Sequence, residues 1–344
     1  MTIAWTERDR ACWEQELAPW LPKRLFDAHV HLFQRASFPP GFEFAPRACY
    51  RKFGGQFDFA QCRDIVQAML PGIDFGMLCF GTPHIEADRE EAARYCGEVG
   101  DGKRFFGMVM VSPEDPAAAV ERRVRDYGLV GYKPYRNFVT GKDAEAVTIP
   151  DMLPAAQMAV ADRLGLAVTL HIPRAERLAD PANRRELVEL CQTYPNAKII
   201  VAHIGRAYYL SNVVGYLDAL AALPNAYLDL AMVNHEGVLE YTFRHFPAER
   251  ILFGSDAPIA WLRGKSVEIN NQYAYLMGED YAIGTSIHDH DHAVEFTFFY
   301  YEMLRGIRLA AERANLSRAQ LEGIFADNAY RLLRQIRAGL EKQP

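Results

Sequence analysis

The sequence lacks several features that would place it in other classes of protein. It has no apolar stretch of the roughly 20 residues that a membrane span needs, and charged residues stand early in its N-terminus, where a secretory signal has an apolar core. It also lacks a basic block that could follow a phosphate backbone, and its formal net charge is −6. We therefore expect no membrane partner, no nucleic-acid partner and a cytoplasmic location.

Paired cysteine motifs are missing as well. The six cysteines are scattered without a CxxC pair, which is typical of reduced thiols in a cytoplasmic protein. The GxGxxG segment that follows the first strand of many open doubly wound sheets is also absent. The chain nevertheless has 344 residues and 50% hydrophobic content, enough for a large core.

Eight short apolar runs recur along the chain and alternate with segments of helical character. Because the runs are apolar almost throughout, they are typical of parallel strands covered on both faces. The predicted strands are residues 24–31, 73–81, 104–111, 129–134, 166–171, 198–203, 226–232 and 251–255. The predicted helices between them are residues 58–70, 86–99, 114–127, 151–164, 181–194, 207–222 and 236–246. This alternation predicts an α/β fold, a closed (β/α)₈ TIM barrel, with an open doubly wound sheet as the alternative.

The barrel repeats leave segments at both ends of the chain. We expect residues 1–22 to form an N-terminal extension, with a helix beside the barrel, and residues 23–341 to form one barrel domain. Residues 291–341 are predicted to be helical, and Ser317 with Gln320 fits a capping box at the start of one helix.

Two long segments follow the first and the last predicted strand. Residues 33–57 are rich in Phe, Pro, Gly and Arg, and residues 257–290 follow strand eight. Loops of this length in a compact domain usually serve as lids or as oligomer contacts. We expect both segments to be loops, and the protein to be a homo-oligomer.

Residues that can bind metals stand at the ends of four predicted strands. His29 and His31 are two apart on strand one, so their side chains face the same side. His171 ends strand five, His203 ends strand six and Asp256 ends strand eight. Strand ends of a TIM barrel converge on one mouth, where active sites lie. A metal-free cluster would leave four histidines and an aspartate to satisfy one another, so the sequence predicts a metal site.

The order of these motifs resembles a known family. The chain reads Asp-x-His-x-His at 27–31, His171, His203, Ser-Asp-x-Pro at 255–258 and Ile-Phe-Ala-Asp-Asn-Ala-Tyr-Arg-Leu-Leu at 324–333. Over about residues 24–335 it resembles the amidohydrolase superfamily, and within it the amidohydrolase-related (amidohydrolase 2) group of hydrolases, lactonases and non-oxidative decarboxylases.

The resemblance implies a ligand set for one divalent metal ion. His29, His31, His171 and Asp256 are the implied ligands, with His203 nearby as an acid/base or a further ligand. Zinc suits a nitrogen-rich site with an open position, and Mn²⁺ or Fe²⁺ are the alternatives. The resemblance leaves a second role for Asp256, which is to accept the proton of the metal-bound water.

Lys133 lies at the end of the predicted strand four, in Gly-Tyr-Lys-Pro-Tyr-Arg. Some superfamily members carry a carboxylated lysine there that bridges two metals. The alternatives are a free ammonium that binds a substrate oxygen, which we favour, and a structural salt bridge.

Further substrate-binding candidates follow the strand ends. Arg136, Arg174 and Arg206 come after strands four, five and six. Three guanidinium groups at one rim of an acidic protein predict recognition of a carboxylate or phosphate. Tyr135, and His84 after strand two, are further pocket candidates, and a rim position without function is the alternative for each.

A histidine-rich segment stands apart from this set. His288, His290 and His292 alternate with aspartates more than 30 residues past strand eight. We expect a solvated loop that leads into the next helix, with Asp291 or a neighbour as its cap. A lid residue that reaches the mouth is the alternative.

Two enzymatic functions fit the predicted site. The first is a metal-dependent hydrolase in which a metal-activated water attacks a lactone, ester or amide carbonyl of a small anionic substrate. The alternative is a non-oxidative decarboxylase or lyase of a carboxylated aromatic substrate, with His203 and Asp256 handling protons. A non-catalytic metal-binding protein is the third alternative, and the intact ligand set with a proton acceptor argues against it.

Overall fold

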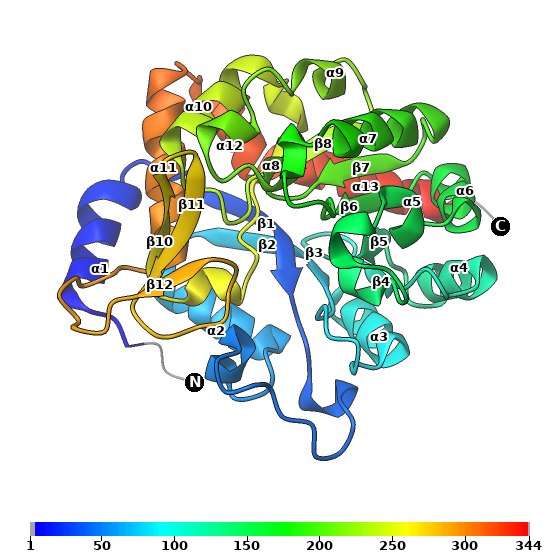
Figure 1. The fold of residues 1–344 in the computed structure, drawn as a ribbon, viewed down its shortest axis with the longest axis horizontal. Coiled ribbons are helices and arrows are strands. Elements are labelled where there is room, and N and C mark those ends of the chain that lie inside the picture. The colour runs from blue at the N-terminus through cyan, green and yellow to red at the C-terminus, as the bar shows by residue number, and fades with distance from the viewer. Residues whose placement is uncertain (1–3, 343–344) are drawn as a thin grey trace.

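The computed structural model describes residues 4–342 and shows parallel strands at the centre, surrounded by helices (Figure 1). The barrel strands are β1 (Arg24–His31), β2 (Asp74–Phe80), β3 (Phe105–Gly107), β4 (Val109–Val111), β5 (Gly131–Pro134), β6 (Ala167–Leu170), β7 (Lys198–Val201), β8 (Ala226–Asp229) and β9 (Ile251–Leu252). β3 and β4 are two halves of one barrel strand, since Met108 between them still donates its N–H to the carbonyl of Cys79 at 2.9 Å. The barrel therefore has eight strands.

The barrel closes between its last and first strands. Neighbouring strands pair in chain order, β1-β2-β3 and β4 to β9. The N–H of Ala28 then donates to the carbonyl of Phe253 at 2.9 Å, and the N–H of His31 donates to Ala257 at 2.7 Å. The predicted TIM barrel is confirmed.

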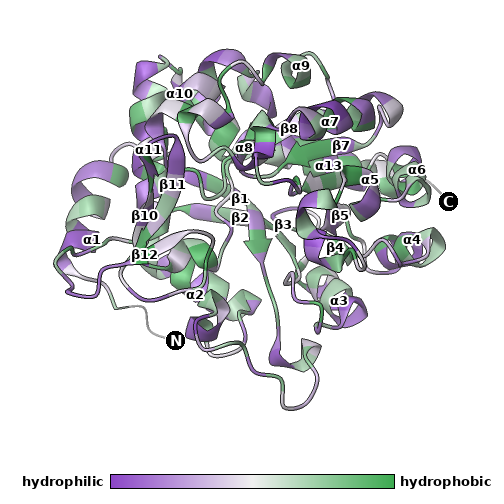
Figure 2. Ribbon diagram, viewed as in Figure 1, coloured by the Kyte–Doolittle hydropathy of each residue, from purple (hydrophilic) through white to green (hydrophobic). Residues whose placement is uncertain are grey.

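Most of the helices follow a barrel strand and cover the outside of the barrel. They are α1 (Glu7–Ala11), α2 (Phe59–Met69), α3 (Arg89–Val99), α4 (Ala117–Asp126), α5 (Ile149–Met152), α6 (Ala155–Leu164), α7 (Pro181–Thr193), α8 (His203–Arg206), α9 (Asp218–Ala221), α10 (Glu236–His245), α11 (Phe299–Arg313), α12 (Arg318–Glu322) and α13 (Asn328–Glu341). Figure 2 shows hydrophobic residues on central strands such as β7 and hydrophilic residues mixed into the surrounding helices. The predicted capping box of Ser317 and Gln320 is confirmed at the start of α12.

Two predicted helices differ from the structure. The helix expected over 151–164 is divided into α5 and α6, because Pro154 cannot continue a helix and holds the residue before it away from the helical region. The helix expected over 207–222 is wrong apart from the short α9. That segment is rich in tyrosine and valine, which have low helix propensity, and carries Gly215 at φ +80°.

The segment after strand eight is not the loop that we expected over 257–290. β10 (Gly264–Ile269) and β11 (Gln272–Met277) form an antiparallel hairpin, and β12 (Ser286–His288) pairs parallel to β11. The expected cap at Asp291 is also wrong, since α11 begins only at Phe299, after Phe298.

The N-terminal segment packs beside the barrel against α11 (Figure 1). α1 continues into a π-helical turn at Cys12–Leu17, where Trp13 stacks on Tyr301 with ring centroids 6.2 Å apart. The guanidinium of Arg263, just before β10, pairs with the buried Asp9. This ion pair connects the N-terminal extension to the segment after strand eight.

Within residues 4–342, no helix combines the length and apolar composition needed to cross a bilayer.

Candidate metal centre

Three of the predicted ligands meet at the carboxyl-terminal end of the barrel. The Nε2 atoms of His29 and His31 lie 3.4 Å and 3.2 Å from Oδ1 of Asp256. Both imidazoles are fully buried, and the Asp256 side chain is 13% exposed. The HxH pair of β1 and the residue that follows β9 come together because closure of the barrel makes these two strands neighbours.

Hydrogen bonds on the far side of each ring fix which nitrogen faces the centre. Nδ1 of His29 lies 2.9 Å from Oδ2 of Asp229, and Nδ1 of His31 lies 2.7 Å from the carbonyl of Gly81. Nδ1 of His203 lies 2.8 Å from the carbonyl of Ala231. Carbonyl and carboxylate oxygens accept hydrogen bonds, so we assign the proton of each ring to Nδ1. Each Nε2 then presents a lone pair, as a metal ligand requires.

The protonation states also suit metal binding. Burial lowers the pKa of His29, His171 and His203, so their imidazoles are neutral at pH 7. Burial raises the pKa of Asp256, but its polar surroundings outweigh burial and lower the pKa, so the carboxyl group is ionised at pH 7. The cluster thus combines neutral nitrogen donors with one carboxylate.

The unpaired oxygen of Asp256 tests whether a metal ion fits these residues. Within residues 4–342, Oδ1 of Asp256 is buried without a hydrogen-bond partner. It faces two imidazole lone pairs with no proton between them, an arrangement of acceptors that repel one another. A cation at that point would satisfy all three. The donor set of nitrogen and carboxylate suits zinc, manganese or iron.

His171 lies beside this cluster. It directly follows β6, and its ring centroid lies 5.3 Å from that of His203 and 5.7 Å from that of Tyr135. Within residues 4–342, the groups of closely spaced potential ligands are His29, His31 and Asp256, and His29, His203 and Asp229. His203 thus lies near His29, and the assignment of His171 as a ligand stays a prediction.

His203 opens an unusual backbone turn after β7. The φ angles of His203, Ile204, Gly205 and Arg206 are +57°, +53°, +65° and +60°. α8 is therefore a left-handed turn, which costs about 1–2 kcal/mol for each residue with a side chain. The N–H of His203 donates to Oδ1 of Asp229 at 2.7 Å and anchors the start of the turn. Such strain persists where the surroundings fix it and clusters at functional sites.

Two buried aspartates that the sequence analysis missed hold the ligands in place. Asp229, at the end of β8, binds Nδ1 of His29 and the N–H of His203. Asp27 accepts hydrogen bonds from the N–H of His29 at 3.1 Å and of Ser255 at 2.8 Å. An acidic residue inside an apolar strand is the signal that could have revealed Asp229.

Replacing Asp229 with Asn should lower metal affinity about 10–100-fold, the usual effect of removing a partner that orients a histidine ligand. The expected cause is a freer His29 ring that has lost its carboxylate partner. Competition with a chromophoric chelator measures the affinity. Asp218→Asn, at an exposed position of α9, serves as the control. An unchanged affinity in the Asp229 variant would show that this contact does not support the centre.

Lys133 lies inside the cluster and not at its rim. The side chain, at the carbonyl end of β5, is fully buried, with Nζ 3.4 Å from Nε2 of His29. The rings of Phe80 and Tyr135 lie 4.9 Å and 5.0 Å from Nζ. Burial lowers the pKa of Lys133 to about 8. A group with this pKa exchanges readily between an ammonium and an amine at the centre.

The three predicted rim arginines have different surroundings. The guanidinium of Arg174 pairs with Glu186 at 2.7 Å and is turned toward α7. Nη1 of Arg136 donates to the carbonyl of Pro173 at 3.2 Å. Nη1 of Arg206 donates to the carbonyls of Ile172, Pro173 and Arg174 at 3.1–3.2 Å. Arg136 and Arg206 thus contact the loop after β6, whereas Arg174 is engaged by an acidic partner.

The remaining two pocket candidates lie at different distances from the ligands. The hydroxyl of Tyr135 lies 3.1 Å from Nε2 of His31, which places it at the centre. His84 lies among aromatic rings of the long first loop, with its ring centroid 4.9 Å from those of Phe44 and Tyr50. The first loop therefore packs on itself around His84.

Two other features take no part in these groups of potential ligands. His288 ends β12 opposite Met277, and its ring centroid lies 4.3 Å from that of His290 and 6.2 Å from that of His292. Neither group of potential ligands in residues 4–342 includes these histidines.

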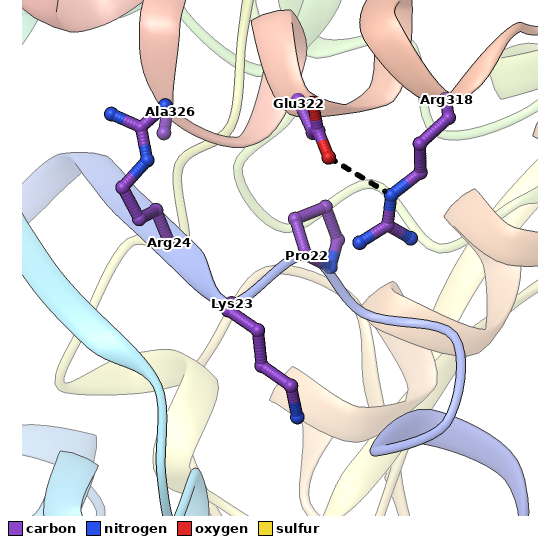
Figure 3. A pocket seen from close by; sticks show the side chains of 6 residues that line it. All are labelled: Pro22, Lys23, Arg24, Arg318, Glu322 and Ala326. Atoms are coloured by element: carbon purple, nitrogen blue, oxygen red, sulfur yellow. Dashed lines mark hydrogen bonds and ion pairs between the residues drawn. The ribbon is translucent and has the colours of Figure 1, made fainter.

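A surface pocket of about 200 Å³ lies next to the start of β1, and Arg318 on its wall pairs with Glu322 (Figure 3). It lies at the opposite end of the strand from His29 and His31.

Comparisons with known proteins give one family match and several similar folds. A family model described as amidohydrolase matches residues 26–335. No curated protein sequence matches the chain. Among solved structures, an amidohydrolase from Burkholderia multivorans with bound HEPES is similar with a TM-score of 0.58 at 15% identity, over 90% of this chain and 98% of that one.

Two decarboxylases are also similar in structure. For 2,6-dihydroxybenzoate decarboxylase from Rhizobium the TM-score is 0.51 at 16% identity, over 92% of this chain and 99% of that one. For a dihydroxybenzoic acid decarboxylase from Polaromonas sp. JS666 with bound manganese and 2-nitroresorcinol it is 0.50 at 17% identity, over 91% and 97%. At these identities the likeness shows a shared fold.

Proposed function

The chain belongs to the amidohydrolase family whose model matches residues 26–335, and from that membership we propose that it is a metal-dependent hydrolase. Its proposed substrate is a small anionic molecule with a lactone, ester or amide carbonyl. The observation that carries the proposal is the buried Oδ1 of Asp256, which has no hydrogen-bond partner within residues 4–342 and faces the Nε2 atoms of His29 and His31.

One divalent ion, zinc by preference, is proposed to bind His29, His31, His171 and Asp256, with His203 beside it. When bound, it would supply Lewis acidity that polarises a carbonyl and lowers the pKa of a water molecule. Manganese is the alternative, and a structural neighbour contains it.

The chain's own groups supply the remaining steps of the proposed reaction. Asp256 is ionised and accepts the proton of the attacking water. His203, whose backbone N–H is held by Asp229 and whose Nδ1 is held by the carbonyl of Ala231, can accept a proton at Nε2 and then return it to the substrate. Lys133 and the hydroxyl of Tyr135 hold a substrate oxygen next to the ligands. Burial of these groups strengthens each of these interactions, since little water competes with them.

Decarboxylation of a carboxylated aromatic substrate is the second candidate function. Two structural neighbours are decarboxylases of dihydroxybenzoates. In this chain, the charge of Asp256 helps to raise the pKa of four tyrosines, Tyr50, Tyr135, Tyr208 and Tyr275, in addition to the effect of burial. The rings of Tyr135 and Tyr208 lie beside the centre, with centroids 6.0 Å from that of His31 and 6.3 Å from that of His203, and this aromatic surface suits a flat ring.

Product analysis separates the two candidates. The protein is reconstituted with zinc or manganese and incubated with a panel of lactones and carboxylated aromatics. We expect new carboxylate from the lactones, no carbon dioxide, and loss of turnover after treatment with a chelator. Release of carbon dioxide from the aromatic acids would instead support the decarboxylase. Turnover that persists without metal would overturn both candidates.

A further inference from the structure

Two arginines near the metal centre lack acidic partners among residues 4–342. Arg177 stands between β6 and α7, and Arg206 ends the left-handed turn after β7. Arg136 and Arg174 have Glu145 and Glu186 within 3.5 Å and 2.7 Å. In the part of the chain that the structure describes, neither Arg177 nor Arg206 forms an ion pair. Two guanidinium charges therefore share one region without a counter-ion.

The surroundings of Arg177 offer aromatic faces but no hydrogen-bond acceptor for its Nε. The guanidinium carbon lies 4.5 Å from the ring centroid of Tyr273 and 5.8 Å from those of Tyr208 and Tyr209. Among residues 4–342, its Nε is buried without a hydrogen-bond partner. A buried donor without a partner costs about 1–3 kcal/mol. A bound anion would remove that cost.

The guanidinium of Arg206 is held in place through one nitrogen, so its other two nitrogens can bind a ligand. Its Nη1 is held by the carbonyls of Ile172, Pro173 and Arg174. Nε and Nη2 make no hydrogen bonds with the described residues. Burial lowers the pKa of Arg206, and the nearby charge of Arg177 acts in the same direction. An anion between the two guanidinium groups would relieve this repulsion.

Both arginines also have a strained backbone. Their φ angles are +59° for Arg177 and +60° for Arg206. The left-handed region is uncommon for residues other than glycine, asparagine and aspartate. Such conformations concentrate at sites of function, where the strain helps to orient a side chain.

The arginine pair borders the metal centre. Ile172, which accepts a hydrogen bond from Arg206, directly follows His171. The ring of Tyr208 connects the two regions, with its centroid 6.3 Å from that of His203 and 4.8 Å from that of Tyr273. Tyr273 lies on β11, so the hairpin after strand eight contributes to this wall.

We propose that Arg177 and Arg206 form a carboxylate-binding subsite beside the metal centre, so that the substrate is a flat dianion. One anionic or carbonyl group lies at the metal ligands, the second carboxylate lies between the two guanidinium groups, and Tyr208 and Tyr273 contact the body of the molecule. This inference rests on the proposed function and names the substrate class. It replaces Arg174 of the predicted rim by Arg177.

Calorimetric titration of the zinc-loaded protein with benzoate, phthalate, isophthalate and terephthalate tests the subsite. We expect at least one dicarboxylate to bind about 10–100-fold more tightly than benzoate, as one additional charge-assisted contact allows. Arg177→Gln should remove this gain. Within residues 4–342 the substitution breaks no hydrogen bond of the Arg177 side chain but removes its contacts with the rings of Tyr208, Tyr209 and Tyr273, so the melting temperature is measured alongside. Arg185→Gln, at an exposed position of the same region, should keep the gain.

A second titration uses protein stripped of metal with a chelator. There the dicarboxylate retains the arginine subsite alone, and Arg177→Gln should abolish the remaining binding. The subsite is overturned if no dicarboxylate binds more tightly than benzoate, or if the gain survives in Arg177→Gln. Failure to bind zinc would overturn the proposed function but not the subsite, because the metal-free titration still measures dicarboxylate binding by Arg177 and Arg206.

Discussion

Replacing His29 with alanine should remove the metal ion and all measurable turnover. The imidazole is fully buried and contacts Asp229, Asp256 and Lys133. Its loss leaves Asp229 without its imidazole partner and removes one of the proposed metal ligands next to Asp256. Elemental analysis should show about one equivalent of metal in the wild-type protein and under a tenth of that in the variant.

The same analysis tests His171, whose assignment rests on its place at the end of β6 beside His203. His171→Ala should also lose the metal. His245→Ala, at an exposed position of α10, is the control that should keep it. Full occupancy in both the His29 and His171 variants would overturn the ligand assignment.

The barrel and the place of the HxH pair could be predicted because both depend on simple patterns. Apolar runs covered on both faces are distinctive in sequence, and β1 has the predicted bounds of 24–31. The other strands are shorter than predicted, so His171, His203 and Asp256 follow their strands by one to four residues. These residues nevertheless follow the carboxyl ends of parallel strands, which lie at the same end of the barrel, so His171 lies beside His203 and Asp256 lies beside His29 and His31.

The positioning groups could not be predicted, because they depend on tertiary contacts. Asp229 is one polar residue in an apolar strand, and its role appears only when β8 is placed near His29. The left-handed turn at His203–Arg206 contradicts local propensity and is held by contacts from other strands. In the sequence, Arg177 cannot be distinguished from a surface arginine, because the ring of Tyr273 that it contacts lies on a hairpin far along the chain.

Replacing Asp256 with asparagine should lower kcat about 10²–10⁴-fold, the usual cost of removing a proton-transfer group. Asparagine has the same shape but lacks the negative charge, and its oxygen is too weak a base to accept a proton from water. KM should change little, because the proposed substrate contacts of Lys133, Arg177 and Arg206 remain. Metal content must be measured alongside, since Asp256 is also a proposed ligand. Asp280→Asn, at an exposed position of the strand-eight segment, should retain the wild-type kcat. A metal-loaded Asp256 variant with near-native kcat would mean that proton transfer depends on another group, and His203 would then be the residue to test.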